Sequence, residues 1–202
     1  LLKNPTNTVV LLQKAELQVN LEQFDAAHRT LDRLLSVTPR DIPALLFQAF
    51  SFIQEKKFDQ ALLTVDKVLR EDPENFQALT AKGIAHMELK DNDSARAAFD
   101  RVLRREPDNP VALRNRALLN VRTQRWGEAK DDYEHLEKLT PRAYAVMYGL
   151  ADVAYNLKEY KKAARLYQDY LKFAPAKGTP ELEEEKTKVR ARLKEIESAP
   201  HQ

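Results

Sequence analysis

Small side chains and prolines return at one fixed interval along most of this chain. Short side chains allow two helices to cross closely, and a proline cannot continue a helix. Each interval is therefore predicted to hold a helix, a close crossing, a second helix and a stop. The interval is 34 residues for the proline column and for two small-residue columns: Pro5, Pro39, Pro73, Pro107, Pro141 and Pro175; Ala15, Ala49, Gly83, Ala117 and Ala151; Ala27, Ala61, Ala95, Ala129 and Ala163.

Larger apolar side chains keep the same register. One column precedes the first small residue, and another follows the second small residue by four positions, which places it on the same helical face. These columns are Leu11, Leu45, Leu79, Leu113 and Met147, and Leu31, Val65, Phe99, Tyr133 and Tyr167. The pattern predicts first helices near 8–20, 42–54, 76–88, 110–122 and 144–156, and second helices near 25–36, 59–70, 93–104, 127–138 and 161–173.

An aromatic residue opens the second helix in four of the five units, at Phe24, Phe58, Trp126 and Tyr160, with Asn92 in the third unit. With these columns the chain resembles the tetratricopeptide repeat family, whose pattern of Leu, small residue, Ala, aromatic and Pro recurs in five consecutive units. The resemblance implies an all-α fold, a right-handed superhelical solenoid of five helix-turn-helix repeats at 8–41, 42–75, 76–109, 110–143 and 144–177. The chain departs from the family in having no glycine at the turns between the helices, where Gln23, Lys57, Asp91, Arg125 and Glu159 lie.

The two ends of the chain leave the repeat pattern. Leu1 and Pro5 fall in repeat columns, so residues 1–7 are predicted to be the end of a preceding repeat. After the last unit the segment 176–180 breaks the period, and an apolar stripe from Leu182 to Ile196 predicts one amphipathic helix. We interpret residues 178–202 as a C-terminal capping helix and tail, with the charged face in water.

Composition narrows the possible partners. The chain has 33 basic and 31 acidic residues, a net charge of +2, so no strong attraction to nucleic acid or to an anionic membrane is expected. No cysteine is present, which excludes disulfides and thiolate nucleophiles, and no apolar run reaches the roughly 18 residues that cross a bilayer. The sequence does not indicate the cellular compartment.

No constellation of catalytic or metal-ligating residues emerges from the sequence. The histidines His28, His86, His135 and His201 lie in different units or in the tail, and the four glycines are scattered. We therefore predict no enzyme activity, no metal and no cofactor.

An RNA-binding helical repeat is the weaker alternative. Such a protein needs recurring base-reading side chains at fixed columns, whereas the corresponding columns here change chemistry from unit to unit. Arg101, Arg104 and Arg105 form a basic cluster, but Asp100 and Glu106 flank it, which favours a solvated face.

In the family, the first helices line a concave surface along which ligands lie. Carried over by register, this implies a binding surface that is apolar in the second and third units and more polar in the fourth and fifth. We call the following residues the predicted groove: Leu46, Phe47, Phe50, Ile53, Ile84, Met87, Arg114, Leu118, Arg122, Tyr148, Asp152 and Tyr155. An alternative interpretation is that some of the apolar members pack between neighbouring first helices.

The functional hypothesis is a protein-interaction scaffold that binds a peptide or a helix of another protein in this groove, because an exposed apolar patch usually marks a partner site. The alternative within the same class is a structural spacer or self-association module of a larger protein, with a homo-oligomer as one possible outcome. The sequence does not identify the partner.

Overall fold

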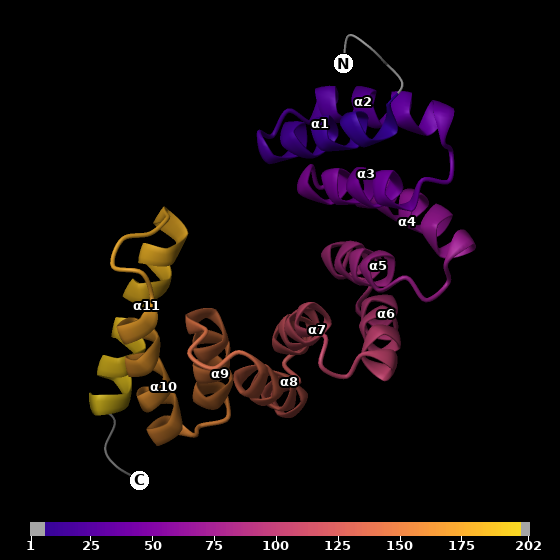
Figure 1. Cartoon of the computed structure of the whole chain (residues 1–202). Coiled ribbons are helices and arrows are strands. Elements are labelled where there is room, and N and C mark those ends of the chain that lie inside the picture. Colours follow the sequence, from indigo (N-terminus) through magenta and orange to yellow (C-terminus); the bar gives the residue numbers. More distant parts are fainter. Residues whose placement is uncertain (1–6, 199–202) are drawn as a thin grey trace. The chain divides into compact units, whose positions relative to one another are not determined.

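The computed structural model describes residues 7–198, and within them the chain forms eleven α-helices and no strand (Figure 1). The predicted all-α helical-repeat solenoid is thereby confirmed as the fold class. The first helices of the five pairs are α1 (Thr8–Asn20), α3 (Ile42–Gln54), α5 (Phe76–Glu88), α7 (Pro110–Arg122) and α9 (Tyr144–Asn156). The second helices are α2 (Phe24–Val37), α4 (Phe58–Glu71), α6 (Asn92–Arg105), α8 (Trp126–Leu139) and α10 (Tyr160–Phe173), and α11 (Pro180–Ser198) follows.

The first helices begin and end at the residues that the periodicity predicts. Each second helix begins one residue earlier than predicted, at the aromatic residue itself or at Asn92. The predicted end of a preceding repeat lies, apart from Asn7, outside the described residues.

A side-chain cap starts four of the five first helices. Asn7, Asp41, Asn75 and Asn109 each accept a hydrogen bond from a backbone N–H of the first turn, at 2.9–3.3 Å. These caps satisfy donors that have no partner inside the helix. Ala143 occupies the same column before α9 and makes no side-chain cap.

A left-handed residue connects the two helices of every pair. Its φ angle lies between 56° and 64°, and the backbone N–H of the next residue returns to the first helix at 2.8–2.9 Å, for example from Lys57 to the Phe52 carbonyl. The left-handed residue therefore lies one position before the turn column that begins with Gln23 and Lys57. No glycine fills this column, so each turn carries a backbone conformation that is unfavourable for L-residues: Glu22, Lys56, Lys90, Gln124 and Lys158.

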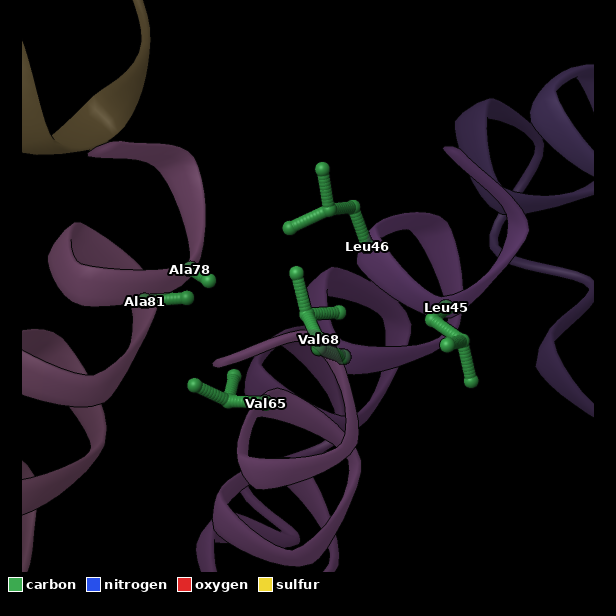
Figure 2. Packing of buried hydrophobic residues seen from close by; sticks show 7 residues of the cluster. Leu45, Leu46, Val65, Val68, Ala78 and Ala81 are labelled. Carbon is green, nitrogen blue, oxygen red and sulfur yellow. The ribbon is translucent and has the colours of Figure 1, made fainter. Parts of the chain in front are cut away.

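The chain divides between Pro107 and Asp108 into two compact units, here called unit 1 (α1–α6) and unit 2 (α7–α11). The core of unit 1 is a row of clusters, each shared by a helix pair and the first helix of the next pair. In Figure 2, Leu45 and Leu46 of α3, Val65 and Val68 of α4, and Ala78 and Ala81 of α5 form one such cluster. A second cluster contains Leu11, Ala15, Leu31, Leu34 and Ala44.

Two glycines allow large aromatic rings into these cores. A β-carbon on Gly83 would lie 2.4 Å from the ring of Phe99, and one on Gly149 would lie 2.3 Å from the ring of Tyr133. Each ring thus occupies the space that a β-carbon on the facing glycine would take.

Helix α11 packs on α10 at the end of unit 2. Among its described residues only Lys186 and Val189 are buried. The Lys186 ammonium donates to the carbonyls of Pro175 and Ala176 at 2.6 and 3.3 Å and to Glu183 at 2.8 Å. It therefore fixes α11 to the connection that precedes it.

Candidate functional site

The predicted groove residues of unit 1 are only partly accessible. Leu46 and Met87 are buried, and Leu46 belongs to the cluster of Figure 2. Phe50 and Ile53 are half-buried and pack against that same cluster, which includes residues of α5. For Leu46, Phe50 and Ile53 this favours the alternative interpretation, packing between neighbouring first helices.

Phe47 and Ile84 are the remaining members in unit 1. Both are half-buried. Phe47 packs against the cluster formed by α1, α2 and α3. The aromatic pair Phe47 and Phe50 therefore contributes to two successive cores as well as to the surface.

In unit 2 the groove residues of α7 are exposed. Arg114, Leu118 and Arg122 follow one another at four-residue spacing, which places them on one face of the helix. Leu118 is 38% exposed. These three side chains form an apolar centre between two guanidinium groups, and we call them the α7 stripe.

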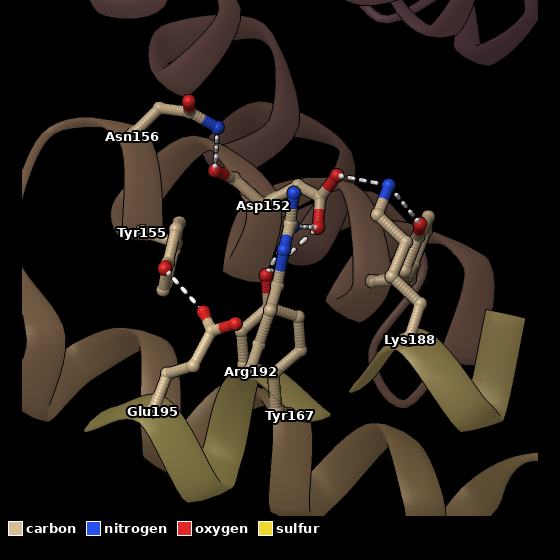
Figure 3. A network of polar contacts seen from close by, with 8 residues as sticks. Asp152, Tyr155, Asn156, Tyr167, Lys188, Arg192 and Glu195 are labelled. Atoms are coloured by element: carbon tan, nitrogen blue, oxygen red, sulfur yellow. Dashed lines mark hydrogen bonds and ion pairs between the residues drawn. The ribbon is translucent and has the colours of Figure 1, made fainter. Parts of the chain in front are cut away.

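The groove residues of α9 meet a different surface, that of α11. Figure 3 shows Asp152 of α9 surrounded by side chains of α10 and α11. Its carboxylate forms an ion pair with Arg192 and accepts a hydrogen bond from the Tyr167 hydroxyl at 2.8 Å. Arg192 also donates to the Tyr167 hydroxyl oxygen at 2.6 Å, so the three groups form a closed triangle.

Two further contacts extend this polar network along α11. The Lys188 ammonium lies 3.7 Å from the second carboxylate oxygen of Asp152 and donates to the Tyr148 hydroxyl at 3.3 Å. The Tyr155 hydroxyl donates to the Glu195 carboxylate at 2.7 Å. All three predicted groove residues of α9 thus have a partner on α11.

Aromatic rings complete the surroundings of the two cations. The Arg192 guanidinium lies 4.8 Å from the centre of the Tyr155 ring and 6.0 Å from that of Tyr167. The Lys188 ammonium lies 5.9 Å from the centre of the Tyr148 ring. Such distances allow a favourable interaction of the cation with the face of the ring.

The protonation states in this network follow from burial and charge. Burial disfavours the charged form of Arg192, but Asp152 and Tyr167 outweigh this effect and raise the pKa of the guanidinium. Burial and the adjacent Asp152 raise the pKa of Tyr167, and the hydrogen bond to Glu195 raises that of Tyr155. The network therefore consists of a charged arginine and protonated hydroxyl donors.

The sequence predicts that the charged face of α11 lies in water, and it does not predict the part that this helix plays. Lys188 and Arg192 reach Asp152 of α9 instead, with side chains that are 50% and 19% exposed. The available signal was the four-residue spacing of two cations near the end of an array whose last first helix carries Asp152.

The histidines of the described residues each lie beside one carboxylate. His86 is 3.1 Å from Asp91, and His135 is 2.6 Å from Asp108. His201 lies outside the described residues. Within residues 7–198 no group of three or more histidine, cysteine, aspartate or glutamate side chains is placed to hold a metal ion. Nor does any helix in that range combine the length and apolar character needed to cross a membrane.

His28 has the most varied surroundings of these histidines. Its Nε2 forms a hydrogen bond with Glu55 and lies 3.4 Å from the Ser51 hydroxyl, and its ring stacks on Phe52. A serine-histidine-carboxylate relay needs the serine and the carboxylate on opposite ring nitrogens. Here both contact the same nitrogen, so the arrangement does not have the geometry of a relay.

The basic cluster at the end of α6 is engaged in an ion pair. Arg101 donates twice to the Glu74 carboxylate, at 3.0 and 2.5 Å, and Arg105 lies 3.9 Å from the same carboxylate. These contacts follow the usual pattern of a solvated, charge-compensated surface.

Comparison with known proteins places this geometry in a wider context. Two models of the tetratricopeptide repeat match the chain, one over residues 52–119 and one over residues 12–76 and 114–177. The second of these spans more than half of the chain. No curated protein sequence matches this chain.

Several solved structures have a similar fold. A tetratricopeptide repeat protein from Parabacteroides merdae ATCC 43184 superposes with a TM-score of 0.74 at 21% identity, over 98% of this chain and 80% of that one. MamA from Desulfovibrio magneticus RS-1 gives a TM-score of 0.73 at 16% identity, over 85% of this chain and 97% of that one. A thermophilic repeat protein of Thermus thermophilus gives 0.71 at 16% identity, over 95% of this chain and 100% of that one.

At these identities the structural likeness shows the fold alone. The family models add the sequence pattern of the repeats, and the helix pairs carry the predicted columns at the predicted places. The chain belongs to the tetratricopeptide repeat family, whose members in general are protein-interaction scaffolds without catalytic activity.

Proposed function

We propose that this chain is a scaffold that binds a peptide or a helix of another protein along the first helices of its repeats. The observation that carries the proposal is the α7 stripe, in which Leu118 is exposed between Arg114 and Arg122. An apolar side chain flanked by two guanidinium groups suits a segment with an apolar anchor and acidic neighbours. In this mode the leucine contributes buried area and the arginines set the orientation.

The α7 stripe is also the best place to test the proposal. Phe47 and Phe50 pack against cores, so their substitution would change stability and binding together. Leu118 can be compared with Leu63 of α4, a leucine that is 68% exposed on a second helix. Leu118→Glu and Leu63→Glu therefore form a matched pair with similar expected effects on stability.

The experiment is selection of binding peptides from a random displayed library with the unaltered chain, followed by calorimetry of the selected peptides. We expect Leu118→Glu to weaken their affinity at least about tenfold, or about 1.4 kcal/mol. Leu63→Glu should leave affinity unchanged, and both variants should melt like the unaltered chain. Equal effects of the two substitutions, or none, would place binding elsewhere.

Self-association is a second candidate, and one observation favours it. Leu17 of α1 is 59% exposed, whereas Ser51, Leu119 and Val153, which occupy the same column in other repeats, are fully buried. For Ser51 and Val153 the preceding second helix, α2 or α8, packs against the first helix. Light scattering of the same samples over a range of concentrations will show whether a second copy covers α1.

A further inference from the structure

We propose that α11 can be displaced from the surface of α9 by a partner helix. This partner helix carries two basic residues four positions apart and binds the face that α11 now covers. This inference rests on the proposed function and adds to it the class of ligand and a means of regulation. The face consists of Tyr148, Asp152 and Tyr155 of α9 with Tyr167 of α10. Figure 3 labels the last three of these residues. We call these four residues the α9 face.

The first reason is the small apolar contact that holds α11. Of its 19 residues only Val189 and Lys186 are buried, while Leu182, Leu193 and Ile196 are half-buried. Lys186 bonds to Pro175, Ala176 and Glu183, which all belong to the preceding connection or to α11 itself. Release from α9 would leave these bonds intact.

The second reason is a difference between equivalent columns of the two units. Leu46, Phe50 and Ile53 in unit 1 form or adjoin an apolar cluster that reaches the next first helix. Three repeats later the same columns hold Tyr148, Asp152 and Tyr155, which meet α11 through hydrogen bonds and ion pairs. Polar contacts exchange for contacts with water at little net free energy, whereas apolar area does not. The contact with α11 is therefore the easier one to open.

The third reason is that the α9 face is selective for cations. Asp152 supplies one carboxylate that contacts both Arg192 and Lys188, and its side chain is 16% exposed. The tyrosine rings lie against the same two cations. A carboxylate among aromatic rings favours guanidinium and ammonium groups and repels an acidic segment.

Helix α11 itself shows the spacing of basic residues that a partner helix needs. Lys188 and Arg192 lie one turn apart on α11, and Glu195 follows on the same side to accept from Tyr155. A partner helix with Lys and Arg at this spacing can make the same contacts once α11 leaves. Because α11 is tethered to the face, it competes at an effective concentration in the millimolar range. Partner binding is then controlled by how firmly α11 is held.

The test uses the full chain and a labelled synthetic peptide with the sequence of residues 180–198. In the double variant Lys188→Gln/Arg192→Gln the tethered helix competes less well, so the peptide should bind at least about tenfold more tightly than to the unaltered chain. The matched control Arg190→Gln/Lys194→Gln removes the same charge from exposed positions of α11 and should bind the peptide like the unaltered chain. Adding Asp152→Asn to the first variant should abolish the gain.

Hydrogen exchange of the unaltered chain provides a second, independent measurement. We expect α11 to exchange faster than α9 and α10. Protection of α11 equal to that of α9, or peptide binding that does not depend on Asp152, would show that α11 is a fixed cap and would overturn the proposal. The peptide in this test is the chain's own helix, whereas the test at Leu118 uses selected peptides. A negative result with the helix peptide therefore does not contradict binding at the α7 stripe, and a negative result at Leu118 does not contradict displacement of α11.

Discussion

Units 1 and 2 build the same repeats with different aromatic residues. Seven of the eight phenylalanines lie within residues 1–107, and all seven tyrosines lie within residues 108–202. The difference extends to the columns where a first helix meets its neighbour, since Phe50 of unit 1 corresponds to Asp152 of unit 2. The repeat fold thus tolerates an aromatic or a charged side chain at the same column.

Because of this difference in polarity, the contacts at these columns are stronger in unit 1 and more selective in unit 2. Apolar burial in unit 1 contributes about 25 cal/mol per Å² and accepts any occupant of the right shape. The hydrogen bonds and ion pairs of unit 2 contribute about 1–3 kcal/mol each, and they specify the charge and the spacing of the side chains that they contact. We infer that unit 1 is the more firmly packed of the two at these columns.

The largest expected effect comes from exchanging the two residues of this column. Phe50→Asp places a carboxylate against the cluster of Leu46, Val65 and Val68, so unit 1 should lose about 3 kcal/mol of unfolding free energy. Asp152→Phe leaves Arg192 without its ion pair and the Tyr167 hydroxyl without its acceptor. The Arg192 side chain is 19% exposed and can reach water, so unit 2 should lose less, about 2 kcal/mol. Hydrogen exchange resolved by helix distinguishes the two units, and equal losses would contradict the comparison.

Alkaline unfolding should affect unit 2 through its buried tyrosines. Burial, with Asp152 nearby, raises the pKa of Tyr133 from 10.0 to about 12. Above pH 10 the unfolded tyrosine ionises first, so the stability that is fully present below pH 10 declines until about pH 12. Tyr133 alone should account for about 3 kcal/mol of this loss.

Urea unfolding followed by the fluorescence of Trp126, the single tryptophan, measures this loss in unit 2. Tyr133→Phe removes this one ionising group, so the loss in this variant should be smaller by about that amount. A loss as steep in the control variant as in the unaltered chain would assign the effect to other residues.

The smallest of the expected effects concerns the helix caps. Ala143→Asn restores in unit 2 the cap that Asn75 provides in unit 1, and it should stabilise unit 2 by about 1 kcal/mol. Asn75→Ala should destabilise unit 1 by a similar amount. Thermal melting of both variants checks the pair, and a neutral Ala143→Asn would mean that the first turn of α9 gains nothing from a side-chain acceptor.

The sequence by itself determined the helices and their pairing. Columns such as Ala49 and Leu45, repeated every 34 residues, specify which side of each helix faces its partner, and the first helices therefore begin and end as predicted. Apolar periodicity depends only on local geometry, so it can be recognised without knowledge of the neighbours.

Only the tertiary structure decided what covers each face. From the sequence, Leu46 and Phe50 are predicted to be accessible to a partner. Their place in the repeat indicates which side of the helix they lie on, but it does not show whether the next helix covers that side. Helix α11 lies outside the repeat and has no column register, so the approach of Arg192 to Asp152 could not be derived from any period. That contact depends on the path of the connection after Pro175 and on the packing of Val189, which bring together residues 40 positions apart.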